Sequence, residues 1–306
     1  MPWLRCSLTL MLLTYVVVTR AQDPPATSIL MTAREALGGD AALSKVRSVT
    51  VSGSLTRDLG HTVTNGTFAY SFELPDKFLH ITRVRFSRGP LGMIETAQSL
   101  GFNGGALIQA AEQPDLPEAL RPPPRTPAQR ALSEQRALLI SQREFIAFVL
   151  PLFGAAPTVV PLQFASPSRQ QSNSAADSID VVGPDGFTWH LFLDPTTHLP
   201  SRLTWMAKPL VLMSTTSLVT VAPGGRVMAR PGDAPMSPSS NDPTVGMPDV
   251  EWQLAISEYR ISDGLNWPHR LTTSYGGRKY DDLKLGNFKI NSSIDTKTFR
   301  PRTAER

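Results

Sequence analysis

The sequence predicts an α+β protein built mostly from antiparallel β-strands. Three observations predict this class. Many segments of strand length alternate apolar and polar residues and end in turn residues. One long helical segment lies between two groups of such strands. The short β-helix-β spacing that a parallel sheet needs is missing, which disfavours a doubly wound fold.

The first 21 residues are typical of a secretory signal peptide. Arg5 precedes an apolar run from Leu8 to Val18, and the small residues Thr19 and Ala21 occupy positions −3 and −1. This run is too short for a stable transmembrane helix, and no later stretch approaches about 18 consecutive apolar residues. We therefore expect an exported protein, periplasmic in a Gram-negative cell after cleavage near Ala21, with no integral membrane segment in the mature chain.

The mature chain, residues 22–306, is predicted to form one domain that is stabilised by its core alone. The only cysteine, Cys6, lies in the signal segment, so a disulfide and a cysteine-bound metal are not expected. Removing Arg5 and Arg20 reduces the formal charge of +4 to a slight basic surplus. Because no block of Lys and Arg follows, nucleic acid is not expected as a partner.

The N-terminal part changes from helical spacing to strand spacing. Leu30, Ala33 and Leu37 follow the helical period, Gly38-Gly39 ends that helix, and Asp40 is predicted to cap a second one. From residue 49 the period is two, with one face formed by Val49, Val51, Gly53 and Leu55. An antiparallel meander is then predicted from "TFAYSFELP", "KFLHITRVRF", "GMIETAQSL" and "GALIQA".

The middle of the chain combines a proline-rich linker with the longest helical segment. Residues 112–127 contain six prolines and cannot form regular structure. The helix that follows is predicted to begin at Pro127 and to end at Pro151. Its C-terminal half is too apolar to lie free in water, so we expect it to pack over the sheet or at an interface.

The second half returns to strands, which are predicted in "SIDVVG", "FTWHLFLDP", "LPSRLTWM", "LVLMSTTSLVTV", "VEWQLAISEYRI", "LNWPHRLTTSY" and "YDDLKLGNFKI". Alternation places one apolar face along Phe187, Trp189, Leu191 and Leu193, and another along Trp252, Leu254 and Ile256. Residues 222–248 are rich in Pro, Gly, Ser and Asp, which predicts a disordered loop or a mobile flap.

The segment "FLDPTTHLPSRL" places Asp194 and His198 four residues apart, a spacing that invites a catalytic interpretation. A turn explains it better, because Asp at the first position bonds to the backbone two residues on and Pro195 presets the next φ. His198 is then expected at an exposed end of the turn. A hydrolase that uses His198 or His190 with a nearby acid stays open as the least favoured alternative.

Other catalytic and metal-binding patterns are missing from the sequence. The histidines lack HxH and HExxH spacing, and neither GxSxG nor a phosphate-binding glycine loop occurs. Glu251, Asp281 and Asp282 are interpreted as solvated residues at strand ends. We expect no metal, no cofactor and no catalytic residue, and thus a protein that is not an enzyme.

The order of several segments resembles the LolA/LolB-like superfamily of outer-membrane lipoprotein-sorting and carrier proteins. The segments are "AREALGGDAALSKVRSVTVSGSL", "LPDKF", "GFNGG", "FLDPTTHLPSRL", "SEYRISDGLNWPHRL" and "FKINSSIDTKTF". They span most of the mature chain, although they are turn and strand-boundary motifs of modest specificity. The chain departs from a minimal carrier in its length and in its insertions at 112–127 and 222–248.

The resemblance implies a curved, incomplete β-barrel, or half-barrel, whose concave apolar face is covered by helices. It also implies a periplasmic binding protein that holds a lipid, a lipoprotein acyl chain or another apolar ligand beneath a helical lid. The residues expected to line this space are Phe68, Phe72, Leu139, Phe145, Ile146, Val149, Trp189, Leu191 and Trp252. The alternative is an envelope sensor or assembly factor that binds another protein.

Overall fold

The computed structural model describes residues 26–60, 62–87, 93–112, 126–153, 162–165, 177–183, 186–209 and 247–300. The helices are α1 (Ala26–Ala36), α2 (Asp40–Leu43), α3 (Pro127–Phe153) and the short 3-10 helix η4 (Thr296–Phe299). The strands before α3 are β1 (Ser48–Asp58), β2 (Val63–Glu73), β3 (Lys77–Ser87), β4 (Met93–Asn103) and β5 (Ala106–Glu112). Those after it are β6 (Gln163–Ala165), β7 (Ser178–Val182), β8 (Thr188–Leu193), β9 (Pro200–Ala207), β10 (Val250–Ser257), β11 (Arg260–Ser262), β12 (Leu265–Trp267), β13 (Arg270–Tyr275) and β14 (Arg278–Ile290).

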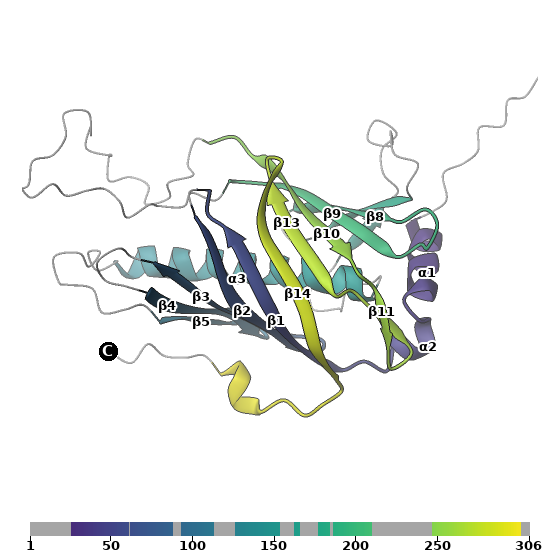
Figure 1. Ribbon diagram of the computed structural model, residues 1–306, viewed down its shortest axis with the longest axis horizontal. Helices are drawn as coiled ribbons and strands as arrows, with labels where there is room; N and C mark the ends of the chain where they lie inside the picture. Colours follow the sequence, from purple (N-terminus) through teal and green to yellow (C-terminus); the bar gives the residue numbers. More distant parts are fainter. Residues whose placement is uncertain are drawn as a thin grey trace, which may run out of the picture.

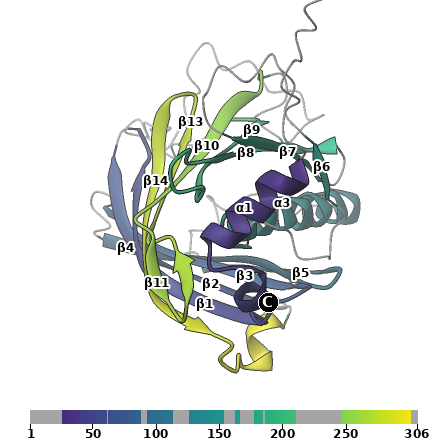
Figure 2. The ribbon, with the colours of Figure 1, turned by 90° about the vertical axis from the view of Figure 1, so that its right-hand side faces the viewer.

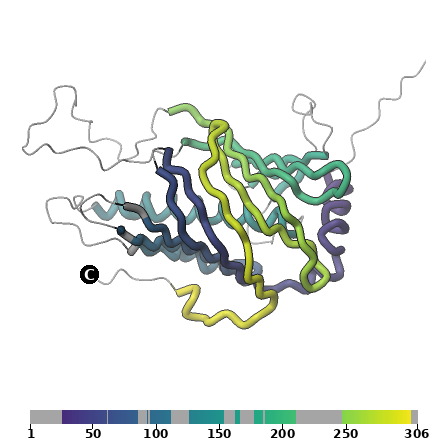
Figure 3. Tube along the Cα trace, in the orientation of Figure 1, coloured from purple at the N-terminus to yellow at the C-terminus, as the bar shows by residue number. Residues whose placement is uncertain are grey.

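Twelve of these strands form one antiparallel sheet in the order β5-β4-β3-β2-β1-β14-β13-β10-β9-β8-β7-β6 (Figure 1). Strands β1 and β14 come from opposite ends of the described chain, yet they lie side by side and join its two halves (Figure 3). The sheet does not close, because β5 and β6 remain at opposite edges. The predicted mostly antiparallel, open sheet is therefore confirmed.

The sheet curves around α3, which lies on its concave side together with α1 (Figure 2). In this view α3 occupies the open side, between the two edge strands β5 and β6. It contacts β4 and β5 from the first half of the chain and β9 from the second half. A small second cluster lies elsewhere, where Leu79 and Ile108 pack with Phe299 of η4.

Helix α1 ends as its sequence predicts, whereas the start of α2 differs from the prediction. The chain turns at Gly38, whose φ of 125° suits glycine, and the backbone N–H of Asn266 donates to the Leu37 carbonyl at 2.9 Å. Asp40 does not cap α2. The N-cap is Gly39, and Asp40 is the first helical residue, where its carboxylate still favours the positive end of the helix.

Helix α3 begins with a capping box formed by Thr126 and Gln129. The Gln129 N–H donates to Thr126 Oγ1 at 3.2 Å, and the Thr126 N–H donates to Gln129 Oε1 at 2.9 Å. Pro127 follows as the first helical residue, as predicted. The predicted end at Pro151 is wrong, because the helix continues to Phe153. Proline removes one backbone hydrogen bond there, but the residues after it are buried in the core and hold the last turn in place.

Two predicted strands each divide into two. "VEWQLAISEYRI" forms β10 and β11, and "LNWPHRLTTSY" forms β12 and β13, so that β11 and β12 pair as a separate hairpin. The backbone explains the first break, since Glu258 has a φ of 58° that a continuous strand does not allow. Pro268 explains the second, because it lacks the N–H that a strand ladder needs.

Several expectations fall outside the described residues. They are the signal segment 1–21, most of the linker 112–127, the strand predicted in "LVLMSTTSLVTV" and nearly all of the loop 222–248. Within the ranges that the structure describes, no helix is long and apolar enough to cross a membrane.

Candidate functional site

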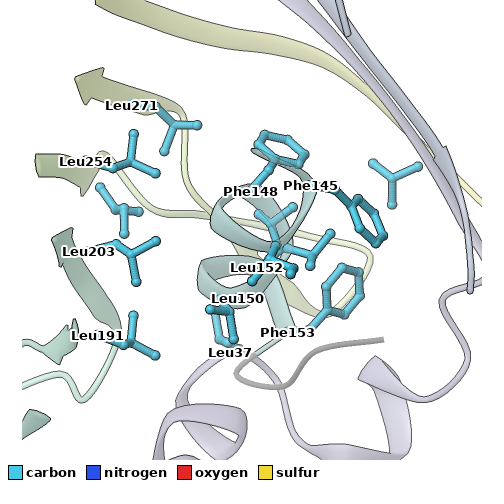
Figure 4. Close-up of a cluster of buried hydrophobic side chains, with 14 of the residues drawn as sticks. Leu37, Phe145, Phe148, Leu150, Leu152, Phe153, Leu191, Leu203, Leu254 and Leu271 are labelled. Carbon is cyan, nitrogen blue, oxygen red and sulfur yellow. The ribbon is translucent and has the colours of Figure 1, made fainter. Parts of the chain in front are cut away.

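The concave face of the sheet is an apolar surface that crosses both halves of the chain. Leu191, Leu203 and Leu254 are opposite one another on β8, β9 and β10, and Leu271 is opposite Leu283 on β13 and β14. Figure 4 shows the leucines of β8, β9, β10 and β13 pointing toward α3. All five side chains are at most 7% exposed. This surface arises because alternate residues of a strand point to the same side.

The C-terminal half of α3 packs against this surface. Its large apolar side chains from Phe145 onward are buried, namely Phe145, Ile146, Phe148, Val149, Leu150, Leu152 and Phe153. The Phe145 ring lies 5.3 Å from the Phe78 ring and 5.4 Å from the Phe102 ring, measured between centroids. The N-terminal half is more open, and Leu132 and Ile140 are at least half exposed. Only the second half of α3 is therefore part of the core.

The structure brings most of the predicted lining residues to one interior. Those in the main core are Phe68, Phe72, Phe145, Ile146, Val149, Trp189 and Leu191. Leu139 is only half-buried and lies on the more open half of α3. Trp252 is buried but belongs to an aromatic cluster beside the main core. Whether these residues contact a ligand stays a prediction.

Side chains of the protein fill the interior between α3 and the sheet. Phe72, Val149 and Leu150 have exposures of 0%, and Phe145 has an exposure of 1%. Two surface pockets are lined by strand and loop residues and by none of α3. One, of about 240 Å³, lies over β7 to β10, and the other, of about 620 Å³, lies near the ends of β2 to β4. A ligand under α3 would therefore have to displace side chains.

A polar cluster connects α3 to the sheet at the middle of the helix. Glu144 Oε1 lies 2.5 Å from His80 Nδ1 and 3.5 Å from Tyr70 Oη. The Tyr70 ring is stacked between those of His80 and Phe148, with centroid distances of 4.2 Å to each. Burial and the nearby Glu144 charge raise the pKa of Tyr70 well above its ordinary value, so its hydroxyl stays protonated.

A partly buried ion pair lies farther along the same face, where Arg57 on β1 is opposite Asp281 on β14. The guanidinium donates two hydrogen bonds of 2.8 Å to the carboxylate, and the two side chains are 17% and 14% exposed. The Arg57 guanidinium also lies 4.9 Å from the centroid of the Tyr280 ring. An aromatic cluster continues from there across β13, β10 and β9 and comprises Tyr280, Tyr275, Trp252 and Trp205.

The prediction that Asp281 and Asp282 are solvated is wrong. Asp281 pairs with Arg57, and the side chain of Asp282, 9% exposed, accepts hydrogen bonds from Arg270 and Lys279. Sequence analysis missed these pairs, and it also missed Glu144 and His80. The missing information was strand register, because Arg57 and Asp281 are 224 residues apart in the chain.

The Asp194 segment is a turn, as predicted. The Asp194 carboxylate accepts hydrogen bonds from the N–H groups of Thr196 and Thr197 and from the Thr197 hydroxyl. The backbone hydrogen bond from Thr197 is the main reason that the pKa of Asp194 is lowered. His198 has a φ of 57°, and its Nδ1 is shielded from solvent, so the expected exposed imidazole is only partly accessible. These bonds explain Asp194 without a catalytic role.

His190 is the other histidine of the hydrolase alternative. Its Nδ1 lies 2.7 Å from Asp180 Oδ1, across the pair of strands β7 and β8, at the 240 Å³ pocket. The hydroxyls of Ser178 and Thr204 line the same pocket. Within the described ranges, neither hydroxyl makes a hydrogen bond to the imidazole, so the pair lacks the activated nucleophile of a triad.

Comparisons with known proteins identify similar solved structures but no sequence family. No family model and no curated protein matches this chain. A LolA superfamily protein from Nitrosomonas europaea is similar over 90% of this chain and 98% of its own, with 12% identity and a TM-score of 0.43. An outer membrane lipoprotein-sorting protein domain from Vibrio parahaemolyticus is similar over 90% and 97%, with 10% identity and a TM-score of 0.44.

A DUF1329 family protein from Desulfovibrio piger is similar over 90% of this chain and 97% of its own, with 8% identity and a TM-score of 0.40. Because these identities and TM-scores are low, the site must be judged from the residues of this chain alone.

Proposed function

We propose that this protein is an exported carrier that holds an apolar ligand, such as a lipid or a lipoprotein acyl chain, between the concave face and α3. One observation supports this most strongly. Helix α3 covers the open side of an unclosed sheet, with α1 beside it, and it does so through side chains. The backbone hydrogen bonds of an α-helix are internal. Helix α3 can therefore move without breaking a strand ladder, and in the half-barrel interpretation it acts as the lid.

Movement of α3 away from the sheet costs too much free energy by itself, so a ligand must replace the apolar contacts that the helix loses. Seven apolar side chains of α3 are buried, and exposing each costs about 1.5–3 kcal/mol. The total of about 10–20 kcal/mol equals or exceeds the stability of a typical domain, which is about 5–15 kcal/mol. An acyl chain of about 15 methylenes recovers about 12 kcal/mol at about 0.8 kcal/mol per methylene. A ligand of that size can thus replace the contacts of the helix.

The proposed location and ligand class have support from the sequence. The apolar segment and small residues of positions 1–21 support export, and the resemblance of several segments to the lipoprotein-sorting superfamily supports an acyl ligand. In a Gram-negative cell this places the carrier in the periplasm. The protein would bind its cargo by shape and apolar contact, and a transient envelope partner would deliver or receive it.

Mass spectrometry of the protein purified from the envelope without detergent tests the proposal first. We expect a lipid or acyl adduct in the native spectrum that is absent from the denatured protein. Binding of a brominated fatty alcohol to delipidated protein then locates the ligand, because bromine quenches nearby tryptophans. Trp189 and Trp252 on the strands of the large sheet should be quenched more than Trp267, which lies on the separate hairpin of β11 and β12.

Single Trp-to-Phe variants assign the quenching to each residue. Trp252→Phe should remove a large part of the fluorescence quenching, whereas the matched control Trp267→Phe should retain most of the quenching. A clean mass without adduct, together with unchanged fluorescence in the presence of the brominated alcohol, would exclude the carrier function.

A further inference from the structure

Two buried polar atoms near the middle of α3 have no hydrogen-bond partner among the described residues. They are Ser141 Oγ and His80 Nε2. Ser141 is 0% exposed, and the His80 side chain is 15% exposed. A buried polar group without a partner costs free energy, and such groups are few in native proteins. Their presence beneath the proposed lid therefore calls for a functional explanation.

Ser141 and His80 are both neighbours of Glu144. Ser141 and Glu144 are three residues apart on α3, which makes their side chains neighbours on the helix surface. Glu144 Oε1 contacts His80 Nδ1 at 2.5 Å, so the other nitrogen of the same ring lies in the same region. Stacking of the Tyr70 ring on the imidazole restrains the orientation of His80. The His80 imidazole and the Ser141 hydroxyl thus both belong to the polar cluster around Glu144, which is bordered by the apolar core.

The hydrogen-bonding roles of these groups follow from Glu144. A carboxylate oxygen accepts hydrogen bonds, so Nδ1 is the donor in the contact between His80 and Glu144. In the neutral imidazole, Nε2 is then an acceptor. The Ser141 hydroxyl both donates and accepts. A group that matches the pair must therefore donate one hydrogen bond to Nε2 and accept one from Oγ.

We infer that His80 and Ser141 form a polar subsite for an uncharged hydroxyl or amide on an otherwise apolar ligand. A hydroxyl or amide supplies both a donor and an acceptor. A methyl ester only accepts, so it leaves Nε2 without a partner. A fatty acid carboxylate also only accepts, and its charge is repelled by Glu144. This inference rests on the proposed carrier function, and it specifies the polar end of the ligand.

Four probes of equal chain length test the inference in the delipidated full chain, namely a fatty alcohol, a primary fatty amide, a methyl ester and a fatty acid. Direct binding measurements should give the alcohol and the amide affinities about tenfold higher than those of the ester and the acid. In Ser141→Ala this preference should fall severalfold, while the affinity for the ester stays the same.

His80→Asn provides a second variant. The asparagine amide nitrogen can take the place of Nδ1 and still donate to Glu144, but nothing replaces Nε2. The preference for alcohol over ester should fall as in Ser141→Ala. The control Ser178→Ala changes a buried serine on β7, away from the subsite, and should keep the full preference.

The stability of the ligand-free variants separates a binding role from a structural one. Because Ser141 Oγ has no hydrogen-bond partner in the described part of the chain, Ser141→Ala should leave the urea midpoint unchanged or raise it. A lower midpoint together with unchanged probe preference would overturn the subsite. Equal binding of all four probes would overturn the subsite and leave the carrier function standing, whereas binding of none would overturn both.

Discussion

Gly53 lies on β1 at the junction of the two halves of the sheet, and its replacement by alanine provides a quantitative test of that junction. A Cβ at Gly53 would lie 1.9 Å from the Lys284 carbonyl oxygen on β14 and 3.0 Å from the Phe68 ring. The first atom belongs to the backbone, so no side-chain rotation can relieve the contact. The two strands would have to separate by about 1 Å locally to bring that contact to 3.0 Å.

The expected cost combines two opposing terms. Forced overpacking of a well-packed region costs about 1–3 kcal/mol, and more where the backbone must move. Replacing glycine by alanine also restricts the unfolded chain, which stabilises the fold by about 0.4–1 kcal/mol. Gly53→Ala should therefore lower the free energy of unfolding by about 1–3 kcal/mol.

Gly286→Ala is the matched control, because Gly286 lies on the same pair of strands. Its Cβ would meet only the Ser52 carbonyl oxygen, at an ordinary 3.7 Å, and its φ is not in the left-handed region. This variant should be neutral or slightly stabilised. Urea unfolding followed by tryptophan fluorescence measures both, with an unchanged m value as the check on two-state behaviour. Equal stability of the two variants would refute the register of β1 and β14 in the structure.

Three further predictions concern charges and helix capping. Hydrogen bonds from Arg270 are the main reason that the pKa of Asp282 lies below its ordinary value of 3.8. The ionised Asp282 therefore stabilises the folded protein fully above about pH 3.8, and this stabilisation is lost as the pH falls below that value. The stability difference between wild type and Asp282→Asn should accordingly be widest near neutral pH and shrink below pH 4, and a constant difference would count against this account. Asp281→Asn should cost about 2–4 kcal/mol because it leaves the Arg57 charge without its partner, and a double-mutant cycle with Arg57→Met that shows no coupling would contradict the ion pair. Thr126→Ala should remove about 1 kcal/mol of local helix stability, detected as faster amide hydrogen exchange in the first turn of α3, and unchanged exchange would argue against the capping box.

Much of the secondary structure follows from local chemistry. The inward faces of β1, β8 and β10 could be predicted because side chains of a strand alternate between its two sides, so apolar residues at every second position define a buried face. The start of α3 could be predicted at Pro127, since its signals are neighbours in sequence. The breaks after β10 and β12 were missed. A residue such as Glu258 adopts a positive φ only when surrounding contacts compensate the strain.

The lining of the proposed site was predicted as a set of apolar residues, but the polar partners were not. Tyr70 and His80 meet Glu144 only because β2, β3 and α3 pack together. Arg57 and Asp281 meet only because β1 pairs with β14. Nothing in the spacing of these residues along the chain indicates either contact. Contacts of this kind depend on which strands are neighbours and on their register. The alternating pattern shows which face of a strand is buried, but it does not show which strand lies beside it.

The sequence by itself determined the class of the fold, the turn at Asp194 and the apolar half of α3, because periodicity, turn chemistry and hydrophobicity act over a few neighbouring residues. Only the tertiary structure decided the order of the strands, the position of α3 across the open side of the sheet and the filled state of the interior. The physical reason is that packing depends on contacts between elements that are far apart in the sequence. The geometry of these contacts is set only when all the elements together remove the apolar face from water.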